Sequence, residues 1–361
     1  MAVSITAAST ENGHTVSSKK ELSEMSIAIE RLHVMLHQEY TIYSNFTNYL
    51  TKEDTSCVTP GISFTERSMD IDRVLRQKTC EWIFDVVDFF GYSREAAMLA
   101  AYYLDRFASL SFTKGMPLSR RSFQLASIAS LLIATKIDGG SPTTDKGYKK
   151  LTISTLVGLG RGQHSFEEIQ QMEIKILRVL WWKVNPPTMA QFISHLMLLF
   201  PSQKNIGTSS QRTDLIVFEM AKYLSELAVC VSELAIEHKP SEIAFASLII
   251  AIDSANTSSI PQDFLTAFKV DAANILNIHA DSKEIHEISA IFKMICPKIA
   301  EQNTYLPQAT QRDVRPHHHC IQNTYLPQAT QRDVRPHHHC IQITDNASGN
   351  RQISPTCISG E

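Results

Sequence analysis

The stretch LSRRSFQLASIASLLIATKIDGG, residues 118–140, decides the fold. After its two arginines it carries a single charged side chain before residue 138, Lys136, and its apolar residues point in every direction around a helix. A helix that is apolar on all sides, but too short and too rich in Ser and Thr to span a bilayer, must be buried by other helices. The sequence therefore predicts the central helix of an all-helical domain, ended by Gly139 and Gly140.

The composition is that of a globular protein with no global attraction to nucleic acid or to membranes. The chain has 361 residues, 43% of them apolar, and a net charge of -3. Its seven cysteines form no closely spaced pairs, which is typical of free thiols in a reducing compartment. The N-terminus lacks a signal-peptide pattern, and no apolar run approaches the ~18 residues of a membrane span. We expect an intracellular protein of the nucleus or cytoplasm, with no nucleic-acid or membrane partner.

Helical periodicity and turn signals divide the chain into five segments. The Ser-, Thr- and Lys-rich start and the C-terminal tail are predicted to be disordered. Between them, a first helix and linker precede two regions that each show about five amphipathic helices around one apolar helix. We predict an all-α fold with two tandem five-helix domains, with boundaries at 1–23, 24–68, 69–187, 188–298 and 299–361.

The tail contains one repeated segment. Residues 302–321 and 322–341 are the same twenty letters in tandem, and two copies without an apolar period cannot stack as a solenoid. Each copy holds three histidines and a cysteine in a row, at 317–320 and 337–340, which raises the possibility of a metal site. Structural zinc ligands, however, are spaced roughly two to five residues apart within a folded loop. We predict incidental metal binding only, and no metal or cofactor in the fold.

A charged residue interrupts an apolar stripe in two predicted helices. Ser165 and Glu168 form a capping box that opens one helix, and Glu173 lies on it about 40° from the centre of the apolar arc. An unpaired carboxylate there would cost several kcal/mol, so it needs a cation or strong donors. Lys136 ends the apolar stripe of the central helix in the same way. Either the two form an internal ion pair, or both face a partner; the pattern leaves both readings open.

Three strings resemble the cyclin box, the fold of the activating subunits of cyclin-dependent kinases. They are YLDRF at 103–107, LASIASLLIATKI at 125–137 and QMEIKILRVLWWKVNPPT at 171–188, and their order and spacing make the resemblance specific. It extends from about Leu75 to Thr188, and in layout to about Pro297. The resemblance implies two tandem cyclin-box domains in a regulatory subunit that is not itself an enzyme.

The resemblance also implies a kinase-binding site. In cyclins, a lysine and a glutamate at the positions of Lys136 and Glu173 bind main-chain groups around the regulatory helix of the kinase. A partner that binds only the active helix position activates the kinase by shifting its population. The expected role is therefore control of cell-cycle progression through a cyclin-dependent kinase, with apolar contacts from Ile137, Leu177, Trp182 and Val184.

A second cyclin surface recruits substrates or inhibitors that carry an Arg-x-Leu motif. Lys78 and Thr79 stand where apolar residues are usual in that surface, so the groove would be less apolar. For the tryptophan of the set, the alternative is a simple core residue. The resemblance assigns this substrate-docking surface to Leu75, Arg76, Trp82 and Gln124.

No catalytic motif competes with this interpretation, and we predict no catalytic residues. The chain lacks a Gly-rich phosphate loop, G-x-S-x-G, H-E-x-x-H and C-x-x-C. One alternative is a nucleic-acid-binding adaptor of the TFIIB core type, which would be expected to carry a strongly basic face and a zinc ribbon. Another is a helical scaffold that activates no kinase.

Overall fold

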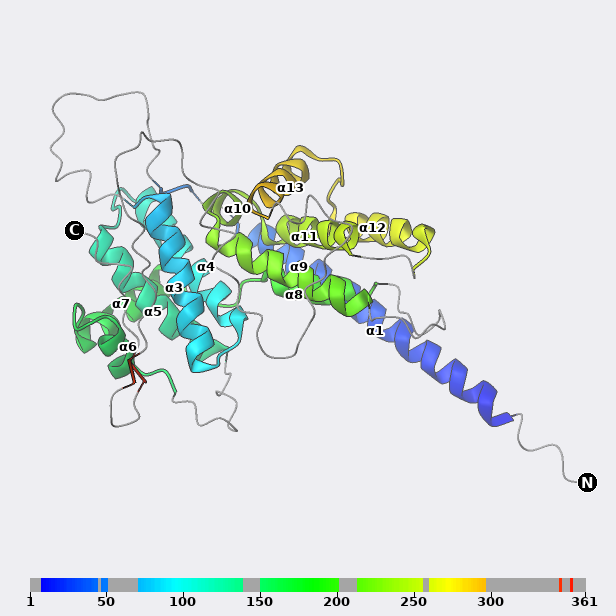
Figure 1. Ribbon diagram of the computed structural model, residues 1–361, viewed down its shortest axis with the longest axis horizontal. Coiled ribbons are helices and arrows are strands. Elements are labelled where there is room, and N and C mark those ends of the chain that lie inside the picture. The colour runs from blue at the N-terminus through cyan, green and yellow to red at the C-terminus, as the bar shows by residue number, and fades with distance from the viewer. Residues whose placement is uncertain are drawn as a thin grey trace, which may run out of the picture. The chain divides into compact units, whose positions relative to one another are not determined.

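The computed structural model shows a helical protein, and the predicted all-α fold is confirmed (Figure 1). Its only strands among the described residues are β1 (Thr344–Asp345) and β2 (Arg351–Gln352), which pair antiparallel. The predicted disorder of residues 1–7, and of 299–361 apart from these strands, falls outside the described residues. The structure describes residues 8–44, 47–50, 71–138, 150–200, 213–255, 260–296, 344–345 and 351–352.

The described chain divides into two compact units. The first, which we call the central-helix unit, contains the described residues of Ser44–Thr188 and Glu226–His238. The second unit contains those of Met1–Tyr43, Met189–Ser225 and Lys239–Thr324. The sequence places a boundary at 187/188 and leaves the N-terminal helix separate. In the structure that helix groups with the second unit, and residues 226–238 group with the first.

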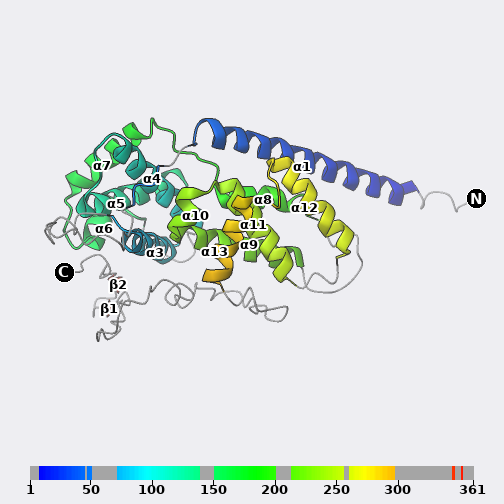
Figure 2. The same ribbon diagram turned by 90° about the horizontal axis from the view of Figure 1, so that it is seen from above.

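The central-helix unit is built around α5 (Arg120–Ile137), the stretch with which the sequence analysis began. Every residue from Leu125 to Thr135 is buried, because α5 packs against α3, α4 and α7 (Figures 1 and 2). The short α6 packs on α7, and α10 packs on α3. The bounds of these neighbours are α3 Arg73–Phe90, α4 Arg94–Thr113, α6 Ile153–Leu159, α7 Phe166–Val179 and α10 Ser232–Glu237.

Local signals set the ends of these helices. Gly91 ends α3 with a left-handed φ of 71°, a conformation that glycine adopts without a steric penalty. The capping box of Ser165 and Glu168 is present at the start of α7. Ser93 precedes α4, but its hydroxyl donates to Asp138 instead of capping that helix. The glycines at 139–140, expected to end α5, lie outside the described residues.

The second unit repeats the plan around α11 (Pro240–Ser254). This helix is apolar on all sides and packs against α8, α12 and α13. The long α1 packs against α8 and α12. Helix α9 begins in this unit, and its residues from Glu226 onward belong to the central-helix unit. The bounds are α1 Ala8–Thr41, α8 Met189–Met197, α9 Thr213–Cys230, α12 Gln262–Leu276 and α13 Lys283–Ile295.

Two helices differ from the sequence expectations. Helix α1 begins at Ala8, whereas the sequence predicts disorder up to residue 23; no proline interrupts residues 8–41, so the helix can extend toward the N-terminus. The apolar periodicity of residues 214–238 predicts one continuous helix, but these residues form α9 and α10. Val231 between them is extended (φ -94°, ψ 113°). It follows another β-branched residue, Val229, and such side chains lower helix propensity.

Candidate functional site

Lys136 and Glu173 form an ion pair at the surface. Lys136 lies in the last turn of α5 and Glu173 in the middle of α7, and Lys136 Nζ lies 2.5 Å from Glu173 Oε1. The lysine side chain is 52% exposed and the glutamate side chain 12%. The two charges that interrupt apolar stripes therefore do pair with each other. The pair is nevertheless open to solvent, because half of the lysine side chain is exposed.

The four apolar residues assigned to the same site come from the ends of α5 and α7. Ile137 follows the paired lysine and is 39% exposed. Leu177 lies one helical turn after Glu173, which places both on the same face of α7, and it is partly exposed. Trp182 is 66% exposed, and Val184 is partly exposed. Apolar surface is thus available at the C-terminal ends of the two helices that carry the ion pair.

The turn after α7 holds two exposed tryptophans in a conformation that bulky residues rarely adopt. Trp181 and Trp182 have φ values of 55° and 58°. Their amides cap α7: Trp181 N donates to Arg178 O (3.1 Å) and Trp182 N to Leu177 O (2.9 Å). Trp181 is 78% exposed and was missed by the sequence analysis. The available signal was two adjacent tryptophans after the end of the apolar period.

Arg76, assigned to substrate docking by resemblance, lies in the core. Its guanidinium binds Asp105 of α4 through two hydrogen bonds, Nε to Oδ1 (2.9 Å) and Nη2 to Oδ2 (2.6 Å). The Tyr49 hydroxyl donates to the same carboxylate (2.6 Å). Arg76 is 0% exposed, so it holds α3 to α4 and offers no atom to a ligand at the surface. Burial, followed by the Asp105 charge, raises the pKa of Tyr49 well above its usual range.

The other three docking residues differ in exposure. Leu75 and Gln124 are partly exposed. Trp82 is 4% exposed and belongs to the core, and its Nε1 has no hydrogen-bond partner among the described residues. Thr79 is buried and donates to the Leu75 carbonyl oxygen (2.7 Å). An Arg-x-Leu groove on this surface stays a prediction, and the exposed parts of it are Leu75 and Gln124.

The described residues contain no group of His, Cys, Asp and Glu side chains that could hold a metal ion. The His-His-His-Cys runs at 317–320 and 337–340 lie outside those residues. Within the described part of the chain, we also find no helix of the length and apolar character that crossing a bilayer requires.

Two solved structures align with part of this chain. A viral cyclin from herpesvirus saimiri aligns with a TM-score of 0.41 and 18% identity, over 63% of this chain and 90% of that one. The CAK complex from Chaetomium thermophilum, bound to ATP-gamma-S, aligns with a TM-score of 0.43 and 14% identity, over 76% of this chain and 74% of the matched chain.

Sequence relatives come from animals and plants. Cyclin-A2 of Bos taurus is 24% identical over 243 residues, which cover 67% of this chain and 51% of the relative. G2/mitotic-specific cyclin-A of Hydra viridissima is 25% identical over 273 residues, covering 75% and 59%. Cyclin-D4-2 of Oryza sativa subsp. japonica is 27% identical over 233 residues, covering 64% and 56%. The matches thus span a little over half the length of these relatives.

The part of the chain that matches a protein family lies in the central-helix unit, which carries the ion pair. Residues 44–185 match the sequence model of the cyclin N-terminal domain. This range begins at the first residue of the central-helix unit and ends three residues before the boundary at Thr188. Residues 44–185 of this chain are therefore similar to the cyclin N-terminal domain, and the relatives named above are cyclins.

Proposed function

We propose that this chain is the regulatory subunit of a cyclin-dependent kinase, and that Lys136 and Glu173 bind main-chain groups of the kinase's regulatory helix. The observation that carries this proposal is an ion pair between the apolar stripes of α5 and α7, in which the lysine side chain is 52% exposed. The match of residues 44–185 to the cyclin N-terminal domain supports a kinase as the class of partner. In this proposal the chain is not an enzyme; it changes the conformation of one.

Lys136 and Glu173 can form hydrogen bonds with main-chain groups at the end of the kinase's regulatory helix. The ammonium group of Lys136 can donate three hydrogen bonds to carbonyl oxygens, and the carboxylate of Glu173 can accept several from N–H groups. An ion pair with an exposed partner contributes only about 0–1 kcal/mol, so giving up the internal contact costs little. Hydrogen bonds to charged groups contribute about 1.5–3 kcal/mol each. Exchanging the internal partner for the kinase main chain is therefore favourable.

The same contacts account for activation. A kinase transfers phosphate only when its strand lysine is paired with the glutamate of its regulatory helix. A partner that binds this arrangement alone shifts the population toward it, and moving a balance from 1:99 to 99:1 takes about 5.5 kcal/mol. Two charged hydrogen-bonding groups supply a large part of that energy. Burial of the exposed Ile137 and Trp182 side chains on binding would add to it.

The biological role that we expect is set by the kinase that the chain activates. We infer that the protein acts in the nucleus or cytoplasm and regulates progression through the cell cycle. The alternatives, a nucleic-acid adaptor and a non-activating scaffold, share the helical fold but not this use of the ion pair.

A reconstituted assay separates the three functions. The full chain is mixed with each of a panel of purified cyclin-dependent kinases, and phosphate transfer to a Ser-Pro peptide is measured. The proposal expects at least one kinase to be activated, and expects no shift of duplex DNA on a gel at physiological salt. Kinase binding without activation would favour the scaffold. A DNA shift without activation of any kinase would favour the adaptor.

A further inference from the structure

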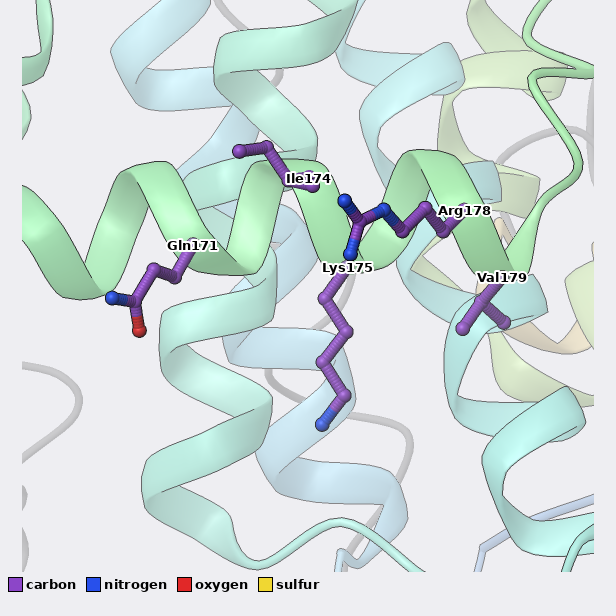
Figure 3. A pocket seen from close by; sticks show the side chains of 5 residues that line it. All are labelled: Gln171, Ile174, Lys175, Arg178 and Val179. Atoms are coloured by element: carbon purple, nitrogen blue, oxygen red, sulfur yellow. The ribbon is translucent and has the colours of Figure 1, made fainter.

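Helix α7 carries a second exposed face that the kinase proposal does not use. Five of its residues recur at spacings of three and four and lie along one side of the helix (Figure 3). They line an open pocket of about 470 Å³. We call this set the cationic face of α7; it consists of Gln171, Ile174, Lys175, Arg178 and Val179.

This face points away from the ion pair of the kinase proposal. At about 100° per residue, Lys175 lies roughly 160° around the helix from Glu173, and Arg178 lies roughly 140° from it. The buried residues Ile169 and Met172 lie nearer to Glu173, at about 40° and 100° from it, and so do not belong to the cationic face. A ligand on the cationic face would therefore leave the Lys136–Glu173 pair accessible.

The two cations on this face lack a carboxylate partner among the described residues. Neither Lys175 nor Arg178 has a salt bridge in the described part of the chain, and Lys175 Nζ lies 5.8 Å from the centre of the buried Phe107 ring. Other cations of the same unit do have carboxylate partners: Arg73, Arg76, Arg94, Arg120, Arg121 and Lys136. Two like charges three positions apart on a helix repel each other, so the binding of negative charge beside them is favoured.

The directions of the Lys175 and Arg178 side chains favour two separate carboxylates over a single phosphate. In Figure 3, the Lys175 and Arg178 side chains extend in different directions from α7, so they do not enclose one point. A single phosphate prefers donors that converge on it. Separated cations suit separated carboxylates. Ile174, which is 40% exposed, and the partly exposed Val179 provide apolar surface beside them.

We propose that the cationic face of α7 docks an acidic peptide segment of a partner protein. Lys175 and Arg178 each receive a carboxylate, and Ile174 and Val179 contact an apolar side chain of the same segment. The charge complementarity of the two cations identifies the partner's chemistry. This docking goes beyond kinase activation and does not depend on it.

The test is fluorescence anisotropy with the full chain and labelled synthetic peptides. One peptide alternates glutamate with leucine, a second replaces each glutamate with glutamine, and a third carries a single phosphoserine in the glutamine background. We expect the glutamate peptide to bind the wild-type chain, with affinity that falls as salt rises. We expect the glutamine peptide to bind about tenfold more weakly or not at all.

Charge reversal provides the matched control. The double variant Lys175→Glu, Arg178→Glu should lose at least about tenfold in affinity for the glutamate peptide. Lys114→Glu, Lys150→Glu changes the net charge equally at two exposed lysines elsewhere in the unit and should bind as wild type does. Equal loss in both variants, or equal affinity for the glutamate and glutamine peptides, would overturn the proposal. Binding of the phosphoserine peptide alone would show that the occupant is a phosphopeptide and that the acidic segment is wrong.

Discussion

The Arg76 guanidinium and the Asp105 carboxylate form a two-point ion pair in which the side chains are 0% and 4% exposed. The pair joins α3 to α4. Removing one member of a buried pair leaves the other charge unpaired, so we expect Arg76→Ala to lower the free energy of unfolding by about 3–5 kcal/mol. Urea denaturation measures this. The control is Arg73→Ala, whose side chain is 50% exposed beside Glu233 and should cost under about 1 kcal/mol. Equal losses would contradict a structural role for Arg76.

The two tryptophans after α7 should contribute little to stability, and Trp182 should contribute to kinase binding. Glycine adopts their left-handed conformation without the cost of about 1–2 kcal/mol that other residues incur, although it loses about 0.5–1 kcal/mol more backbone entropy on folding. Because both side chains are largely exposed, Trp181→Gly and Trp182→Gly should leave the free energy of unfolding nearly unchanged. Trp182→Gly should nevertheless weaken binding to the kinase.

Calorimetry and a kinase-binding assay measure these two effects. Leu180→Gly serves as the control, because Leu180 is 1% exposed and its loss should destabilise the fold by several kcal/mol. If Trp182→Gly destabilised the chain as much as Leu180→Gly, the tryptophan would be a packing residue rather than a contact residue.

His164 should make stability depend on pH. It is 2% exposed, and neither ring nitrogen has a partner among the described residues. Burial, followed by the Arg121 charge, lowers its pKa below the usual 6.5, and Glu168 only partly opposes this. The folded state therefore binds a proton less readily than the unfolded state. Its contribution to stability is present above pH 6.5 and is lost as pH falls from 6.5 through the lowered pKa.

The measurement is the urea midpoint as a function of pH for the wild type and His164→Leu. The variant should lose less stability than the wild type between pH 6.5 and the lowered pKa of the histidine. Parallel curves for the two proteins would show that this histidine does not contribute to the pH dependence.

Binding of an Arg-x-Leu peptide should not involve a contact with Arg76, because that side chain is buried. Leu75 and Gln124 are the partly exposed members of the predicted groove. We expect the double variant Leu75→Ala, Gln124→Ala to weaken peptide binding, measured by anisotropy. Trp82→Ala is a poor probe, since truncating a buried tryptophan costs about 3–5 kcal/mol of stability; Trp82→Phe keeps most of the packing. Unchanged affinity in the double variant would remove this site.

Much of the fold was predictable because its signals are local. The apolar character of α5 on all sides, and the capping box at Ser165, place two helices from the sequence alone. An ion pair between Lys136 and Glu173 was one of the two arrangements that the sequence indicated, since each residue is a charge on an apolar stripe. Such a stripe must be buried, and a buried charge needs a partner.

Other features could not be predicted from patterns in the sequence. Nothing near Arg76 in sequence shows that Tyr49 and Asp105 converge on it, so its resemblance to a docking residue could not be weighed against burial. The left-handed turn at Trp181 is likewise set by how α7 ends. Its amide hydrogen bond to Arg178 is visible only in three dimensions.

A charge swap tests the central claim most directly. In the variant Lys136→Glu, Glu173→Lys, the two side chains can still pair, so a purely structural ion pair would survive. We expect the variant to unfold at nearly the same urea concentration as wild type. Its affinity for the kinase, measured by calorimetry, should fall about a hundredfold or more, because two charged hydrogen-bonding groups then face the wrong main-chain partners.

The matched control is Lys283→Glu, Glu287→Lys, which swaps an exposed ion pair on α13 and should bind the kinase as wild type does. If the swap at positions 136 and 173 folds and binds and activates the kinase with wild-type affinity, the pair does not bind the kinase main chain, and the account is contradicted.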